Sequence, residues 1–140
     1  MKRVLVDASA IYALVARRDR NHASARAYLA QSIESGTRFV LADVAFGETM
    51  TLLRSRHGAE ASIRIGRQLR RSALYVWRPT VRGAERATWD IFQQHDDTAW
   101  SYTDCAVFAL SHRLGIAEVF AYDTHFDQMP DLLRVPPRTS

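Results

Sequence analysis

The sequence has little cysteine and lysine and no long hydrophobic run, and each shortage excludes a class of protein. A single cysteine, Cys105, excludes an internal disulfide framework and a zinc site built from cysteines. No apolar run approaches the ~18 residues that a membrane-spanning helix needs. The first residues enter an apolar run without the segments of a signal peptide, so we expect a cytoplasmic protein that does not contact a membrane.

The composition that is present is that of one soluble globular domain. The chain has 140 residues, of which 47% are apolar and 24% are charged, which is enough for one core and too little for two. We predict a single domain over residues 1–134 and a loose tail over 135–140. The formal net charge of +4 is unevenly distributed, because residues 54–86 contain nine arginines and two acidic residues.

Apolar runs and helical patterns alternate along the chain. Short runs rich in β-branched residues predict strands at 4–6, 39–41, 74–77 and 119–122, with a short fifth strand at 132–135. Helical patterns lie between them, and the expected caps are Asn21, Asp43, Thr80 and Ser101. Gly58 separates two helices, at about 43–56 and 59–71. This alternation predicts an α/β fold with a central, mainly parallel sheet of four to five strands.

Four acidic residues lie at positions where a metal centre would place them. Asp7 and Asp123 follow the first and fourth predicted strands, Glu48 lies one turn into a helix, and Asp104 lies in the first turn of another. In parallel sheets, reactive groups gather at the carboxyl ends of the strands. Two like charges 4 Å apart repel by about 4 kcal/mol at an effective dielectric constant of 20, so a cluster needs cations such as Mg²⁺. Each acid also has an ordinary interpretation as a cap, a turn residue or an ion-pair partner.

Four short motifs resemble those of the PIN-domain nucleases. They are the strand with D-x-S at Val4–Ala10, the helix with its early Glu at Ala42–Thr49, the S-Y-x-D segment at Trp100–Cys105, and the D-x-x-F segment at Ala121–Phe126. Their order and approximate spacing also match, and the length resembles that of the VapC-type toxin ribonucleases of toxin–antitoxin pairs. The resemblance implies a PIN-like α/β/α sandwich.

The resemblance also implies an activity and a set of site residues. It implies endonucleolytic hydrolysis of RNA by a metal-activated water, with Mg²⁺, or alternatively Mn²⁺, held by Asp7, Glu48, Asp104 and Asp123. Residues expected to orient these carboxylates or to touch substrate are Ser9, Ser101 and Thr103, and Asp127 would extend the acidic rim. The implied partners are an RNA substrate, a cognate antitoxin protein and a second copy of the chain in a homodimer. We interpret Asp43 as a helix cap. His125, two residues after Asp123, is in a position to reach a phosphate, but we interpret it as an ordinary surface histidine.

The arginine-rich segment is the expected site of RNA backbone contacts. Arg64, Arg67 and Arg71 share one face of the predicted helix, opposite its apolar side. Such a stripe suits a phosphate backbone, although a solvated charged face explains the same pattern.

Two alternatives to a nuclease remain at this stage. A phosphatase of the haloacid-dehalogenase kind also begins with a strand and an Asp, but it requires D-x-D, where this chain has Ser9, and a late lysine, whereas Lys2 is the only lysine. A non-catalytic RNA-binding or assembly module could use the same fold, although it would not need all four acids.

Overall fold

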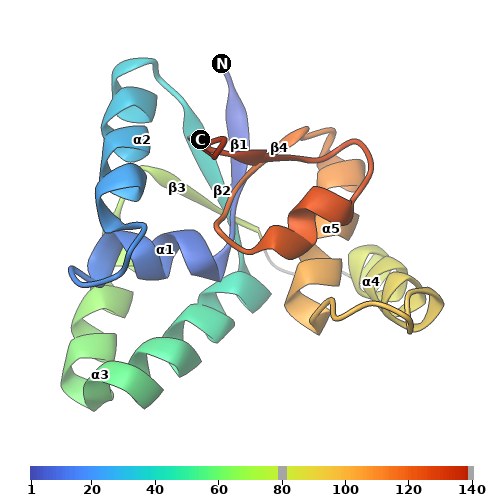
Figure 1. Cartoon of the computed structure of the whole chain (residues 1–140), viewed down its shortest axis with the longest axis horizontal. Helices are drawn as coiled ribbons and strands as arrows, with labels where there is room; N and C mark the ends of the chain where they lie inside the picture. Colours follow the sequence, from blue (N-terminus) through green and yellow to red (C-terminus); the bar gives the residue numbers. More distant parts are fainter. Residues whose placement is uncertain (79–81, 139–140) are drawn as a thin grey trace.

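The protein is an α/β domain with helices on both faces of one sheet (Figure 1). The computed structural model describes residues 1–78 and 82–138. In chain order, its elements are β1 (Arg3–Val6), α1 (Ala8–Val15), α2 (His22–Glu34), β2 (Arg38–Ala42), α3 (Asp43–Arg71), β3 (Tyr75–Arg78), α4 (Arg82–Gln94), α5 (Tyr102–Leu114), β4 (Glu118–Phe120), the 3-10 helix η1 (Thr124–Gln128) and β5 (Leu133–Val135).

The five strands form a single sheet in the order β3-β2-β1-β4-β5, and every neighbouring pair is parallel. The central strand β1 is buried on both faces, with Val4, Leu5 and Val6 no more than 1% exposed. Strands buried on both faces read as continuous apolar runs, which explains why the short valine- and leucine-rich segments predict them. The prediction of a mainly parallel sheet is confirmed.

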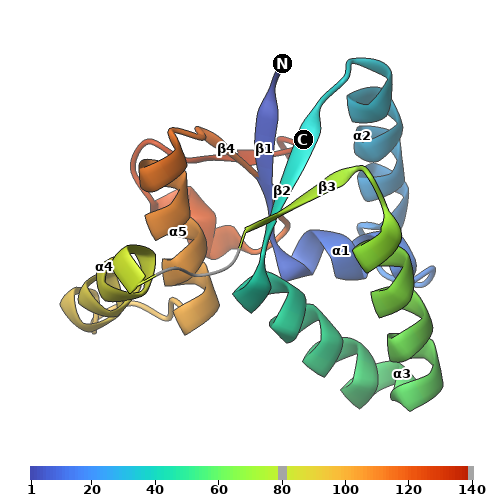
Figure 2. The same cartoon turned by 180° about the vertical axis from the view of Figure 1, so that it is seen from behind.

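Helices cover both faces of the sheet, as the sandwich interpretation predicts. Helices α1, α2 and the second half of α3 lie on one side, and α4 and α5 lie on the other (Figures 1 and 2). Helix α5 is buried over eight consecutive residues, from Asp104 to Ser111. The core therefore lies on both sides of β1 and β4, and it positions the first turn of α5 against the sheet edge where β1 ends.

Helix α3 consists of two arms joined at Gly58, as the sequence predicts. Gly58 has φ 89° and ψ 173°, a combination outside the helical region that favours glycine because it carries no Cβ. The two arms form a V, and the second arm turns back toward α1 and α2 (Figure 2). The first arm begins directly after β2 at the same sheet edge as the end of β1.

Two local predictions differ from the structure, and a third cannot be compared with it. Strand β4 ends at Phe120 rather than Tyr122. Strand β5 extends to Val135, one residue beyond the predicted domain boundary, and that residue is 6% exposed. The predicted cap Thr80 lies outside the described residues.

Two other predicted caps behave differently from the expectation. Asn21 occupies the N-cap position of α2 but makes no capping hydrogen bond with its side chain. Asp43 is the first residue of α3, after the N-cap residue Ala42, and its carboxylate accepts a hydrogen bond from the Val44 N–H at 2.8 Å. Its negative charge still lies at the positive end of the helix dipole.

Candidate metal centre

The four predicted acids belong to four elements that meet at one edge of the sheet. Asp7 follows β1 and is the N-cap of α1, and Asp123 follows the adjacent parallel strand β4 as the N-cap of η1. Glu48 lies in the first arm of α3, and Asp104 lies in the first turn of α5. From β1 the chain adds β2 and β3 on one side of the sheet and then β4 and β5 on the other, so the strand order reverses between β1 and β4. Ligands bind at such a switch point in open α/β sheets.

Asp7 is buried and only half satisfied. Its side chain is at the sheet edge but only 2% exposed. One carboxylate oxygen, Oδ2, accepts hydrogen bonds from the Ser9 hydroxyl at 2.6 Å and the Ser9 N–H at 3.1 Å. The other, Oδ1, is buried without a hydrogen-bond partner among the residues described. The pKa of Asp7 is raised to about 7, chiefly by burial; the Ser9 hydrogen bonds oppose the shift, and the charges of Asp104 and Glu48 add to it.

The Ser9 hydroxyl connects the ends of the two central strands. It donates to Asp7 and accepts the backbone N–H groups of Tyr122 at 3.0 Å and Asp123 at 3.3 Å. These two N–H groups are thus bonded to a side chain rather than to a neighbouring strand, and β4 stops at Phe120, before the predicted end. The predicted orienting role of Ser9 thus has a concrete geometry, since it fixes Asp7 relative to Asp123.

Asp104 is held by a capping box at the start of α5. Its backbone N–H donates to the Ser101 hydroxyl at 3.0 Å, and its Oδ2 accepts the Ser101 N–H at 2.8 Å. The S-x-x-D pattern predicts this arrangement. The Asp104 side chain is 2% exposed, so its carboxylate is buried. The capping box fixes the direction in which this carboxylate points.

Glu48 completes the acidic cluster from the opposite helix. Burial raises the pKa of Glu48, the negative charges of Asp104 and Asp123 raise it further, and a hydrogen bond with Thr103 lowers it. Both carboxylates therefore lie near enough to Glu48 to repel its charged form. Thr103, which is predicted to orient a carboxylate, hydrogen-bonds Glu48.

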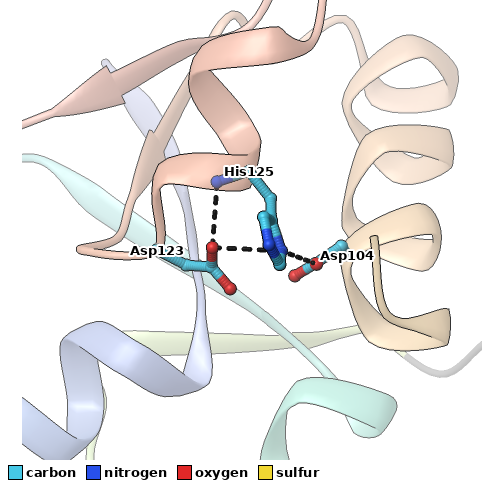
Figure 3. A group of neighbouring side chains, drawn as sticks. All are labelled: Asp104, Asp123 and His125. Carbon is cyan, nitrogen blue, oxygen red and sulfur yellow. Dashed lines mark hydrogen bonds and ion pairs between the residues drawn. The ribbon is translucent and has the colours of Figure 1, made fainter. Parts of the chain in front are cut away.

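His125 lies between two of the predicted carboxylates, whereas we interpret it from the sequence as a surface residue. Its Nδ1 is 2.8 Å from Asp104 Oδ2 and 3.2 Å from Asp123 Oδ1, as Figure 3 shows. Its backbone N–H donates to Asp123 Oδ1 at 2.9 Å. The hydrogen bond with Asp104 raises the pKa of His125, burial lowers it, and the charges of both aspartates raise it. The available signal was its spacing, two residues after a strand-end aspartate.

Two sets of predicted site residues have surroundings that the sequence does not predict. The Asp127 carboxylate binds Arg134 through two hydrogen bonds, of 2.9 and 3.1 Å, and the Arg134 side chain is buried. Arg64, Arg67 and Arg71 line a 590 Å³ groove together with Ile63 on the second arm of α3. That arm packs on the α1 and α2 side of the molecule, away from α5 (Figures 1 and 2).

The donor set fits a divalent cation. Among the described residues, the ligand atoms of Asp104, Asp123 and His125 lie within 4.8 Å of one another. Asp7 lies near enough for its charge to interact with those of Asp104 and Glu48. Its Oδ1 has no partner among the described residues, and such a buried oxygen is costly unless a proton or cation satisfies it. Carboxylate oxygens are the donors that Mg²⁺ prefers, and one nitrogen in the set also suits transition metals.

The same combination of fold and acidic sheet edge characterises a known family. The family model of the PIN domain matches residues 4–132. This chain belongs to the PIN domain family. The match includes all four motifs, and it removes the phosphatase alternative.

Two comparisons relate this PIN domain to one toxin. The 23S rRNA-specific endonuclease VapC20 of Mycobacterium tuberculosis is 30% identical over 80 residues, which are 57% of this chain and 60% of that protein. The aligned part thus spans less than two thirds of the relative. The crystal structure of VapC20, described as a toxin that cleaves the sarcin-ricin loop, has a TM-score of 0.82 and 25% identity, covering 91% of this chain and 95% of that one.

Two more distant structures share the fold of this PIN domain. VapBC2 from Rickettsia felis, bound to a DNA fragment from its promoter, gives a TM-score of 0.69 at 9% identity and covers 94% of this chain and 96% of the other. FitAB, bound to an IR36 DNA fragment, gives 0.64 at 13% identity with 94% and 92% coverage. Among the described residues of this PIN domain, no helix is long and apolar enough to cross a membrane.

Proposed function

We propose that this protein is a metal-dependent endoribonuclease and the toxin of a toxin–antitoxin pair. The observation that carries the proposal is the buried Asp7 carboxylate, which has an unpartnered oxygen and lies among further acids at the switch point of the sheet. Its similarity to VapC20, named a 23S rRNA-specific endonuclease, supports RNA as the substrate class.

In this proposal, Asp7, Glu48, Asp104 and Asp123 hold Mg²⁺ or Mn²⁺. Such a cation lowers the pKa of a water that attacks phosphorus and stabilises the charge on the leaving oxygen. Ser9 keeps Asp7 and the end of β4 in register. Residues with supporting contacts are Ser101, which orients Asp104, and Thr103, which hydrogen-bonds Glu48.

The test is cleavage of structured RNA by the purified chain. We expect isolated ribosomal RNA or an RNA stem-loop to be cut with Mg²⁺ or Mn²⁺, to remain intact with EDTA, and to yield 5′-phosphate ends. Glu48→Gln keeps the shape of the side chain and should abolish cleavage. Glu34→Gln, on the exposed end of α2, is the matched control. RNA binding without cleavage under all metal conditions would replace the proposal by the non-catalytic alternative.

The arginine face of α3 is proposed to contact the RNA backbone. The groove formed by Arg64, Arg67 and Arg71 is near Ile63, which is 43% exposed. Removing one arginine–phosphate ion pair lowers the slope of log affinity against log salt by about 0.7 to 1. Arg67→Gln should therefore weaken RNA binding and reduce that slope, whereas Arg113→Gln, on the exposed end of α5, should not.

Two protein partners complete the proposal. We expect an antitoxin to bind this chain, since structural neighbours include VapBC2 and FitAB, and we expect the chain to form a homodimer. Light scattering of the chain alone, and after co-expression with the neighbouring reading frame, measures both. A monomer in the first measurement would exclude the homodimer, and an unchanged mass in the second would exclude that partner.

A further inference from the structure

His125 differs from the other histidines in what its ring faces. The Nδ1 atoms of His22 and His95 lie against the backbone carbonyls of Ala13 and Ile91, at 2.8 and 2.9 Å. Among the described residues, only the Nδ1 of His125 lies within hydrogen-bond distance of two carboxylates. A nitrogen held there is either a permanent counter-ion or a metal ligand.

The spacing of the donors fits a shared cation. Ligands at about 2.1 Å from an octahedral cation lie about 3 Å apart along each edge of the octahedron. The Nδ1 of His125 is 2.8 Å from one carboxylate oxygen and 3.2 Å from the other. The nitrogen therefore already lies at the separation of a neighbouring ligand from each oxygen, and all three donor atoms lie within 4.8 Å of one another.

Main-chain N–H groups hold the two carboxylate oxygens independently of the His125 ring. The His125 N–H binds Asp123 Oδ1, which sets the start of η1, and the Ser101 N–H binds Asp104 Oδ2. The His125 side chain is about one third exposed, so solvent can reach the ring. A donor set fixed by main-chain contacts loses little entropy when an ion binds.

An independent observation points to a ligand in the same place. The buried Oδ1 of Asp7 has no partner among the described residues, and its charge interacts with that of Asp104. A positively charged imidazole leaves that oxygen without a hydrogen bond. A cation shared by the cluster would satisfy it.

We infer that His125 is a ligand of the metal centre through Nδ1 and that this nitrogen makes the centre prefer Mn²⁺ over Mg²⁺. The inference deepens the proposed function, because it concerns the same centre. Mg²⁺ takes oxygen ligands and keeps several waters, whereas transition metals accept imidazole readily. Mn²⁺ matches Mg²⁺ in charge and geometry and accepts both donor types.

The experiment measures metal binding by the full chain, independently of cleavage. Mn²⁺ binding is followed by the loss of the free-ion electron paramagnetic resonance signal, and Mg²⁺ binding by titration calorimetry. His125→Asn places an amide oxygen near the position of Nδ1, and His125→Ala removes the donor. His112→Asn, at the exposed end of α5, is the matched control.

We expect the wild-type chain to bind Mn²⁺ more tightly than Mg²⁺. His125→Ala should lower Mn²⁺ affinity by on the order of tenfold or more but Mg²⁺ affinity by less than about threefold, and His125→Asn should bring the two affinities together. Pulsed resonance spectra of bound Mn²⁺ should show coupling to ¹⁴N in the wild type and in His112→Asn but not in His125→Asn. If a variant fails to fold, which circular dichroism detects, the ¹⁴N coupling in the wild type still decides.

Three outcomes overturn the inference. The absence of ¹⁴N coupling in the wild type excludes the ligand, and equal or tighter binding of both ions by His125→Ala makes the imidazole a competing counter-ion. A chain that binds no metal overturns the inference and the metal dependence of the proposed function together. Bound Mn²⁺ with ¹⁴N coupling in a chain that cuts no RNA overturns the proposed function alone.

Discussion

Replacing Asp7 by Asn should stabilise the metal-free protein above neutral pH. Burial raises the pKa of Asp7 from 3.8 to about 7 in the folded state. A carboxyl group with a raised pKa holds its proton more tightly in the folded than in the unfolded chain. The free energy of unfolding therefore falls as the pH rises from about 4 to 7 and stays low above that range. Asn carries no charge at any pH and avoids this loss.

The size of the effect follows from the pKa shift and from one unsatisfied donor in the variant. A shift of about three units corresponds to about 4 kcal/mol at pH 8 and to roughly 2 kcal/mol at pH 5. The Asn oxygen can still accept both hydrogen bonds from Ser9, but its NH₂ group takes the place of Oδ1, which has no partner. An unsatisfied buried donor costs about 1–3 kcal/mol. The net expectation is a gain of about 1–3 kcal/mol at pH 8 and a change near zero at pH 5.

Urea denaturation in EDTA at pH 8 and pH 5 measures both values. Asp96→Asn, which removes a negative charge from an exposed position, is the matched control and should shift stability by less than about 0.5 kcal/mol. Added Mn²⁺ should reverse the order at pH 8, since an ion bound only by the folded wild type stabilises it by mass action. Two results would refute the reasoning about a buried charged Asp7. One is an Asp7→Asn variant that is less stable than wild type at pH 8, and the other is a gain in stability that is the same at pH 8 and pH 5.

Three further predictions concern the frame around the site, and denaturation measures each. Gly58→Ala should destabilise the chain by about 1–2 kcal/mol, because φ is 89° at that residue. The control Gly47→Ala, at a helical position with open space around it, should stabilise the chain by up to about 1 kcal/mol. Equal effects of the two substitutions would contradict the kink at Gly58. Ser9→Ala should cost about 1–3 kcal/mol, because it removes a donor to a buried carboxylate and an acceptor for two N–H groups; a neutral result would show that the bridge is not needed. Asp127→Ala should cost about 2 kcal/mol by leaving the buried Arg134 unpaired, and adding Arg134→Met should recover most of it; additive destabilisation would argue against the pair.

Patterns that depend on neighbouring residues are predicted well from this sequence. The run from Val4 to Val6 predicts a strand buried on both faces, and S-x-x-D predicts the capping box of Ser101 and Asp104. The break at Gly58 follows from glycine chemistry alone. In each case a few adjacent residues determine the geometry, and tertiary packing reinforces the same choice.

Features that depend on contacts between distant segments are not predicted. The N–H groups of Tyr122 and Asp123, just beyond the end of β4, are bonded to the Ser9 hydroxyl, which lies more than 110 residues earlier. The sequence spacing of Asp127 suggests the acidic rim, but its carboxylate binds the buried Arg134. His125 faces Asp104 only because η1 folds back toward α5, and no periodic pattern carries that information.

The position of β1 in the middle of the sheet has a consequence for the time at which the site first exists in a growing chain. Strand β1 pairs with β2 on one side and with β4 on the other, and β4 begins only at Glu118. A chain emerging from the ribosome can therefore form the part of the sheet made of β1, β2 and β3 early. The acidic cluster around Asp7 is completed only later, when Asp104 and Asp123 have been synthesised. The protein is proposed to cut RNA, and it is made on a ribosome, which is rich in RNA. Its metal centre cannot assemble there until almost the entire domain has been synthesised.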